Sequence, residues 1–183
     1  MKKVAIIGSA KNGGAAQIIE IASRSSIPYS FVIFDRDKSL IGYKVFDVEV
    51  TGTSEQVFEY WENDKFDAAI IAIGGDLIER KQIFDRLVGN GVPFVNIIDK
   101  NVVFGINYNL GVGNVIMNNS YFGNNVQIGN NNYFLNNISI QHDSKVGSSN
   151  YFSTGTTLGA HCEVGDSIRF EINEILKTRN IKI

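Results

Sequence analysis

The sequence contains little of what usually marks a secreted or membrane protein. Cys162 is the only cysteine among 183 residues, so no disulfide can form within the chain. No apolar run approaches the roughly 20 residues needed to cross a bilayer, and the chain passes from Met1 into an apolar, strand-like segment without the pattern of a signal peptide. We therefore expect a cytoplasmic protein without disulfide bonds.

An excess of positive charge is also missing. The 17 Lys and Arg residues are outnumbered by 19 Asp and Glu residues, which gives a formal net charge of −2. A nucleic-acid partner normally requires a basic surface, so a small molecule or another protein is the expected partner. Hydrophobic residues make up 44% of the chain, enough to build a core and to argue against disorder.

The composition changes near residue 100. Before that point, short apolar runs alternate with helix-like segments; after it, Asn and Gly become frequent and helix formers become rare. We expect a Rossmann-like α/β domain at 1–99 and a second domain at 100–183. In the first domain, the expected strands are 4–8, 31–35, 66–74 and 92–98, and the expected helices are 13–24, 54–63 and 76–89. Alternation of this kind predicts a parallel sheet.

The first turn of this domain, "GSAKNGG", follows a strand and precedes a helix, where backbone N–H groups and the helix dipole favour a phosphate. Gly8 and Gly13 fit the outer glycines of G-x-G-x-x-G, but Ala10 places a methyl group where a dinucleotide pyrophosphate needs bare backbone. NAD is therefore disfavoured, and the turn either packs the helix on the sheet or binds another phosphate-bearing ligand. Asp35, at the end of the second strand, is either a hydrogen-bond acceptor for a ribose or base or an ordinary turn residue.

The second domain shows a repeat of six residues. Every sixth residue from 104 to 170 is apolar: Phe104, Leu110, Ile116, Phe122, Ile128, Phe134, Ile140, Val146, Phe152, Leu158, Val164 and Phe170. Glycine often follows, and then comes a polar pair such as Asn-Asn, which tolerates a left-handed backbone. This pattern predicts a parallel β-helix of hexapeptide repeats, with three hexads, or 18 residues, in each coil.

One corner pair departs from the Asn and Ser pattern, because it is His142-Asp143. One coil later lies position 160, so we expect His161 on the same edge of the helix. The pair is either another polar corner or a catalytic base whose tautomer is fixed by the acid. Cys162 occupies an inward slot, which predicts core packing.

The chain resembles a family of bacterial enzymes in three segments, "IIGSAKNGG", "AIGGDLIER" and "ISIQHDSKVG". These segments are similar to those of nucleotide-sugar acetyltransferases of the sialic acid O-acetyltransferase and bacillosamine N-acetyltransferase family. The resemblance extends to about residue 170. It implies homotrimers of left-handed β-helices, with acetyl-CoA as co-substrate and a nucleotide-linked amino-dideoxy sugar of bacterial glycan biosynthesis as the acetyl acceptor.

The resemblance also implies roles for individual residues. The base would be His142 and its orienting acid Asp143, with direct acetyl transfer and no metal. The nucleotide sugar would be held by Gly8, Ser9, Ala10, Asn12, Gly13, Asp35 and Gly74. The acetyl-CoA side would contain Tyr151, Gly159, Ala160 and His161, with the backbone N–H groups near Gly159 and Ala160 as donors to the oxyanion. The family often has Gly-His where this chain has Lys11-Asn12, and a second histidine where this chain has Tyr151.

Two alternatives remain open. Family members continue with further coils that carry much of the acetyl-CoA site, whereas this sequence ends with "EINEILKTRNIKI", either a short amphipathic cap or the start of more coils. A non-catalytic trimeric scaffold that binds nucleotide sugars is therefore the main alternative. The second is a zinc enzyme similar to the β-helical carbonic anhydrases, in which Asp143 or a histidine of another subunit would complete the ligands. Outward tyrosines at 121, 133 and 151 favour assembly into a trimer.

Overall fold

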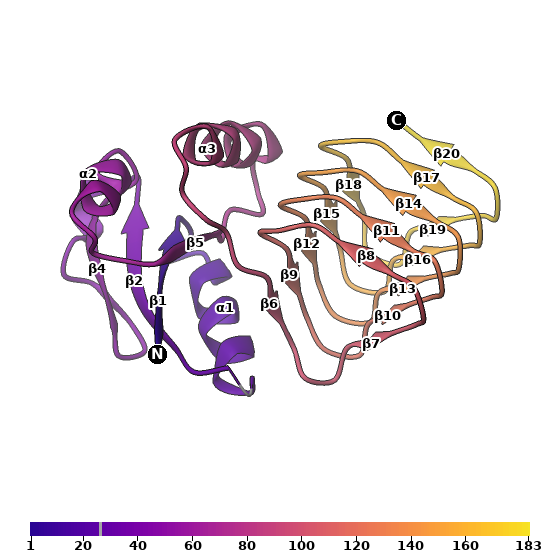
Figure 1. Cartoon of the computed structure of the whole chain (residues 1–183), viewed down its shortest axis with the longest axis horizontal. Helices are drawn as coiled ribbons and strands as arrows, with labels where there is room; N and C mark the ends of the chain where they lie inside the picture. The colour runs from indigo at the N-terminus through magenta and orange to yellow at the C-terminus, as the bar shows by residue number, and fades with distance from the viewer. Residues whose placement is uncertain (26) are drawn as a thin grey trace. The chain divides into compact units, whose positions relative to one another are not determined.

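The computed structural model describes residues 1–25 and 27–183, which form two compact units, Met1–Ile97 and Ile98–Ile183. Within these residues, no helix is both long enough and apolar enough to cross a membrane. Figure 1 shows an α/β unit at the N-terminal end and a stack of coils at the C-terminal end of the chain.

The first unit contains a five-stranded sheet in the order β3-β4-β2-β1-β5, in which only β3 runs antiparallel to its neighbour. Its elements are β1 (Lys2–Ile7), α1 (Gly14–Ser23), β2 (Tyr29–Asp35), a 3-10 turn (Lys38–Leu40), β3 (Lys44–Val45), β4 (Val48–Thr53), α2 (Val57–Glu62), β5 (Ala68–Ile71) and α3 (Leu77–Gly89). The three predicted helices and the first three predicted strands are present. The predicted strand at 92–98 is wrong for this sheet, where only an isolated bridge joins Phe94 to Ala69. Strands β3 and β4 were not predicted.

Both faces of this sheet are covered. The four residues of β5 are fully buried, as are Val4 to Ile7 of β1, which is typical of central strands in a parallel sheet. Helices α2 and α3 contribute to the core cluster on one face, through Val57 and Leu87 among others, and α1 lies on the other face (Figure 1). The carboxyl ends of β1, β2 and β5 therefore meet at one edge of the sheet.

The second unit is a left-handed parallel β-helix, which confirms the prediction made from the repeat. Its strands are β6 (Ile97–Ile98), β7 (Val103–Phe104), β8 (Asn109–Leu110), β9 (Val115–Ile116), β10 (Tyr121–Phe122), β11 (Gln127–Ile128), β12 (Tyr133–Phe134), β13 (Ser139–Ile140), β14 (Lys145–Val146), β15 (Tyr151–Phe152), β16 (Thr157–Leu158), β17 (Glu163–Val164), β18 (Arg169–Phe170), β19 (Ile175–Leu176) and β20 (Ile181–Lys182). They form three parallel sheets of five strands each, so the coil has three faces. Each strand pairs with the strand 18 residues later, for example Tyr121 with Ser139.

The inward residues stack from coil to coil. Phe152 is fully buried between Phe134 and Phe170, with ring centroids 4.6 Å apart on each side. The repeat continues past Phe170, because β19 and β20 add Leu176 and Lys182 to the inward columns. Of the two predictions for the last residues, the amphipathic cap is therefore wrong, because these residues form a further turn of the β-helix. Lys182 covers the Phe170 ring, with its ammonium 4.1 Å from the ring centroid.

A second inward column is polar, which the sequence analysis did not predict. Asn114, Asn132 and Asn150 are completely buried and lie 18 residues apart. Each side-chain oxygen accepts the backbone N–H one coil later, as in the 2.9 Å bond from the Asn132 N–H to Asn114 Oδ1. Each amide also donates to a carbonyl oxygen, so burial of these polar groups is compensated by hydrogen bonds.

The corners adopt the left-handed backbone that the polar pairs predict. In each pair the second residue has positive φ, about 60°, as at Asn125 (58°) and Asp143 (58°). Asn tolerates this region at low cost, which explains its use at successive corners. The first residue of the pair does not need this conformation, so the backbone at His142 places no special requirement on that side chain.

Candidate functional site

The turn after β1 is built tightly against its surroundings. Gly8 has φ of 84°, and a Cβ there would lie 2.5 Å from Cγ1 of Ile73. Ser9 is also left-handed, with φ of 57°, and Gly13, with φ of 87°, precedes the first residue of α1. The turn thus brings the predicted residues Gly8, Ser9 and Gly13 to the carboxyl edge of the sheet.

Both carboxylate oxygens of Asp35 accept hydrogen bonds from nearby backbone N–H groups. Its Oδ2 accepts the Ala10 N–H at 2.9 Å, and its Oδ1 accepts the Asp37 N–H at 3.1 Å. The residue is 7% exposed. Asp35 therefore holds the turn in shape, which is closer to the turn-residue interpretation than to direct contact with a ribose. The Ala10 side chain is buried, whereas Asn12 and the neighbouring Lys11 are exposed.

The segment after β5 completes this edge of the sheet. The turn packs against Ile73, which immediately precedes Gly74, so the predicted residues of the first unit gather at one place. Arg80 of α3 is completely buried, and its Nη1 donates to the carbonyl oxygens of Ile71 (2.8 Å) and Ile73 (3.0 Å). In this sheet the chain goes from β1 to β2 on one side and to β5 on the other, and ligands of open α/β sheets bind at such a switch point.

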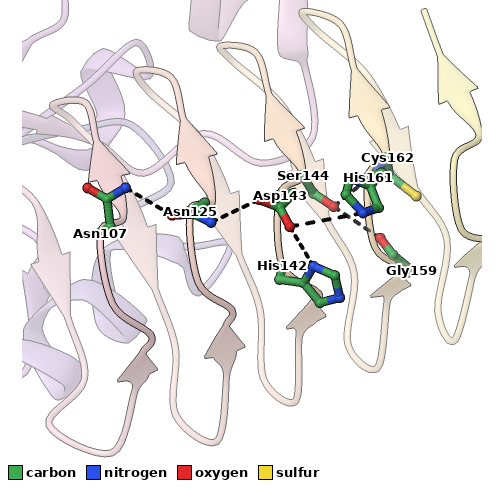
Figure 2. Close-up of polar contacts among 8 residues, drawn as sticks. All are labelled: Asn107, Asn125, His142, Asp143, Ser144, Gly159, His161 and Cys162. Carbon is green, nitrogen blue, oxygen red and sulfur yellow. Dashed lines mark hydrogen bonds and ion pairs between the residues drawn. The ribbon is translucent and has the colours of Figure 1, made fainter.

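In the second unit, His142 and Asp143 form a hydrogen-bonded pair at the corner between β13 and β14. The distance from His142 Nδ1 to Asp143 Oδ2 is 2.6 Å (Figure 2). A carboxylate can only accept, so the Nδ1 of a neutral imidazole carries the proton and Nε2 is left as an acceptor. The imidazole is 53% exposed, so a substrate can reach it.

Asp143 is oriented by a second partner that the sequence analysis missed. Its Oδ1 accepts from Asn125 Nδ2 at 2.9 Å, and Asn125 in turn accepts from Asn107 Nδ2 at 2.9 Å (Figure 2). The bonds from His142 and Asn125 keep the pKa of Asp143 below its ordinary value. The signal was present in the sequence, because Asn107, Asn125, Asp143 and His161 are spaced by one coil.

His161 lies beside this pair, as its spacing predicts. Its backbone N–H donates to the His142 carbonyl at 3.1 Å, and the two rings meet edge to face with centroids 5.3 Å apart. His161 Nε2 lies 4.0 Å from Asp143 Oδ2. The three side chains place one possible ligand atom each within 4.8 Å of one another, so the cluster has the donor set for a transition metal.

The predicted oxyanion donors differ from one another. The Gly159 N–H donates to the Leu176 carbonyl at 2.8 Å, so it is occupied by the ladder. The Ala160 N–H has no acceptor among residues 1–25 and 27–183, and it lies one coil from His142. Of the two predicted backbone donors, only Ala160 is therefore available to a ligand.

Tyr151 is not brought to this cluster within the chain. It lies on β15, in a different sheet from β13 and β14, and its ring stacks with Tyr133 at 5.6 Å and lies 4.5 Å from the Arg169 guanidinium carbon. Cys162 is buried and its thiol contacts the Lys177 carbonyl oxygen, consistent with the predicted core role.

Comparison with known proteins supports the fold. No protein-family model matches the sequence, and no curated protein matches it. PerB from Caulobacter crescentus, solved with CoA and GDP-perosamine, has a TM-score of 0.71 and 20% identity over 100% of this chain and 89% of that chain. A mutant of perosamine N-acetyltransferase from the same organism, with the same ligands, has a TM-score of 0.65 and 19% identity with the same coverage. The acetyltransferase domain of PglB from Neisseria gonorrhoeae has a TM-score of 0.59 and 17% identity over 97% and 86% of the two chains.

These structures are acetyltransferases of the kind that the three sequence segments suggested, so the resemblance is confirmed at the level of the fold. Identities of 17–20% establish the shared architecture, and function must be argued from this chain's own residues. The relevant residues are the turn after β1 and the cluster around His142.

Proposed function

We propose that the protein is an acetyl-CoA-dependent N-acetyltransferase that acts on a nucleotide-linked amino-dideoxy sugar. The observation that carries this proposal is the 2.6 Å bond between His142 and Asp143 at an exposed corner of the β-helix. At this corner Asp143 has the left-handed backbone and His142 does not, so an imidazole at position 142 is not required for the turn. Neighbours of the same fold that were solved with CoA or acetyl coenzyme A support the choice of co-substrate.

The reaction follows from the orientation of His142. The amine of the sugar attacks the thioester carbonyl carbon, a C–N bond forms, and the nitrogen becomes acidic. Nε2 of His142 takes that proton, while Asp143 stabilises the resulting imidazolium. Collapse of the tetrahedral intermediate breaks the C–S bond, and the imidazolium returns the proton to the departing CoA thiolate. The backbone N–H of Ala160 is the candidate donor to the oxyanion.

The first unit would hold the nucleotide part of the substrate. We assign it a Rossmann-like role in which the partly exposed Ser9 and the exposed Lys11 and Asn12 of the turn face the phosphates. Gly8 and Gly13 would allow close approach of the backbone, with Gly74 beside them. Asp35 would act indirectly, because both its oxygens already bind the turn. This arrangement is compatible with a ligand such as the GDP-perosamine bound in the PerB structure, but it does not favour one nucleobase over another.

We also propose a homotrimer, in which Tyr151 and the acetyl-CoA side of another subunit complete the site around His142. The face that carries β7, β10, β13, β16 and β19 suits such an interface, because its outward residues are uncharged: Val103, Tyr121, Ser139, Thr157 and Ile175. Tyr133 contributes nothing to it, because that side chain is only 1% exposed.

The test is an assay of CoA thiol release with acetyl-CoA and a panel of nucleotide-linked amino sugars. Transfer to at least one amino sugar, and none to the matching hydroxyl sugars, is expected. Calorimetry with acetyl-CoA and with each sugar nucleotide separately distinguishes the alternative. Sugar-nucleotide binding without acetyl-CoA binding or turnover would favour the non-catalytic scaffold.

A further inference from the structure

The cluster around His142 contains one more functional side chain than acetyl transfer requires. The mechanism above uses His142 and Asp143 but gives His161 no proton to move. His161 nevertheless lies within ion-pair distance of Asp143 and packs edge to face against His142. Two imidazoles that share one carboxylate therefore need a separate explanation.

The backbone holds these three residues firmly. Asp143 and His161 occupy equivalent corners of adjacent coils, with φ of 58° and 57°. The N–H of His161 bonds to the His142 carbonyl, and the N–H of Asp143 bonds to the Asn124 carbonyl at 2.9 Å. Only side-chain rotations remain, so the donor atoms stay near one another in the free protein.

The spacing of the donor atoms suits a small transition-metal ion. A tetrahedral ion with ligands at about 2.0–2.1 Å needs donors separated by about 3.3 Å. The observed separations from Asp143 Oδ2 are 2.6 Å to His142 Nδ1 and 4.0 Å to His161 Nε2. These values bracket the required one, and small rotations of two half-exposed rings would equalise them.

We propose that His142, Asp143 and His161 form a binding site for a divalent transition metal of the zinc class, and that the metal inhibits the enzyme. Two imidazole nitrogens and one carboxylate favour zinc or cobalt over magnesium and calcium, which prefer all-oxygen ligands. Solvent would supply the fourth ligand. This role differs from that of a catalytic zinc. The metal would bind Nδ1 of His142, the nitrogen that donates its hydrogen bond to Asp143 in the active enzyme.

Inhibition follows from the tautomer of His142, and this part of the inference rests on the proposed function. With Nδ1 bound to the metal, the proton of the neutral imidazole resides on Nε2. Nε2 then has no lone pair with which to accept the amine proton. The proton has moved from one ring nitrogen to the other, no bond to substrate changes, and removal of the metal restores the active tautomer.

The site can be tested independently of activity by titrating the untagged chain with Co²⁺ and following the visible absorption of the ion. We expect the intense bands of a four-coordinate site, one ion per chain, and competition by Zn²⁺. His142→Asn and His161→Asn should each weaken binding by at least about 100-fold, because each removes a ligand. Both substitutions suit a corner of this helix, and melting curves check the fold.

The matched control is Asn137→His, which places an imidazole at an equivalent left-handed corner on another edge, away from the cluster. It should leave cobalt binding unchanged. Absence of saturable binding at about 1 mM Co²⁺, or equal binding by wild type and both histidine variants, would overturn the site.

Inhibition is measured separately, as turnover with Zn²⁺ and after chelation. Wild type should be inhibited reversibly, and His161→Asn should lose this sensitivity relative to its own metal-free rate. Metal binding without inhibition of turnover would overturn the proposed regulatory role but would leave the metal site itself supported. Binding by a protein that shows no acetyl transfer would overturn the proposed function and leave the metal site standing.

Discussion

At the scale of single residues, the proposed role of His142 depends on how Asp143 is held. One oxygen accepts from His142 and the other from Asn125, so the carboxylate plane is fixed by two hydrogen bonds. A fixed carboxylate keeps the imidazole in the tautomer that exposes Nε2. Asn125 therefore acts on His142 through Asp143, without touching a substrate.

The first prediction concerns Asn125→Ala. Loss of the amide should allow the Asp143 carboxylate to rotate. Turnover should fall by about tenfold, the low end of the effects seen when a residue that orients a functional side chain is removed. The pH profile of turnover should also change, because the lost hydrogen bond had kept the pKa of Asp143 low. Steady-state rates across pH are the measurement.

Asn137→Ala is the matched control for that variant. Asn137 is also a corner residue with positive φ, 60°, and its side chain has no hydrogen-bond partner in the part of the chain that the structure describes. Both alanines should lose similar stability, about 1–2 kcal/mol, from the left-handed backbone. Equal pH profiles for the two variants would contradict a positioning role for Asn125.

A second prediction concerns stability against pH. The hydrogen bond from His142, and then that from Asn125, lower the pKa of Asp143 in the folded chain. A depressed carboxyl pKa contributes stability above the ordinary value of 3.8, and this contribution is lost as the pH falls through the lower folded value. The difference in unfolding free energy between wild type and Asp143→Asn should therefore move in favour of the variant below about pH 4. Urea titrations at several pH values measure it, and a difference that stays constant down to about pH 3 would refute the coupling.

Residue types and spacing predicted part of this site. The corner pair, the 18-residue coil and the position of His161 could be read from the sequence, because hexad geometry is nearly invariant. The bonds of Asp35 to its own turn could not, because a carboxylate at the end of a strand is compatible with either a ligand or the backbone. Asn125 was missed because an Asn corner has an adequate structural explanation.

At the scale of elements, the coils stack so closely that some glycines after the inward apolar positions, Gly123 among them, have no room for a Cβ. A Cβ on Gly123 would lie 2.6 Å from the backbone nitrogen of His142 and 3.1 Å from the carbonyl carbon of Gln141. These are backbone atoms of the coil that carries the proposed base, and they cannot move independently of it. Glycine at position 123 is therefore needed to keep the backbone of His142 in its observed position.

The third prediction is that Gly123→Ala destabilises the protein by about 1–3 kcal/mol, as expected for an added methyl group in a packed region. Turnover should fall as well, because the clash displaces His142. Gly89→Ala, at the end of α3, is the comparison: a Cβ added there would meet nothing within 4 Å, so its effect should be within about 1 kcal/mol. Equal stability of the two variants in urea denaturation would contradict this prediction, because it would show that the coils can move apart to accept the methyl group.

The elements themselves were predictable where periodicity was strong. The inward series identified the β-helix, and the alternation of apolar runs identified the core strands of the first unit. Strand β3 was missed because it is a short strand at the sheet edge, where such strands are expected. Strand β4 was missed because charged and polar residues such as Glu49 interrupt its apolar pattern. The sequence left the last residues open between a cap and further coils, because Lys182 occupies an inward position, which sequence periodicity counts as a break.

At the scale of the whole molecule, the outward faces of the β-helix differ in charge. The face with Tyr121 carries uncharged outward residues, whereas the face with Gln127 also carries Lys145 and Glu163, 3.5 Å apart. The uncharged face is the better interface between copies, since desolvated charges are costly there. His142 lies at the edge where these two faces meet.

The fourth prediction follows from this asymmetry. Tyr121→Glu should dissociate the proposed trimer, because it buries a carboxylate in an uncharged interface. Gln127→Glu, on the same coil and also exposed, should leave the assembly intact. Light scattering at micromolar concentration measures both, and a wild-type chain that is monomeric there would remove the trimer and the shared site with it.

The most direct test of the central claim compares wild type with His142→Asn in the acetyl-transfer assay on an amino sugar that wild type accepts. Asparagine suits this corner, so the melting temperature should not change, whereas turnover should fall by about 100-fold to 10,000-fold through loss of the general base. A His142→Asn protein that melts like wild type and keeps full turnover would contradict the account.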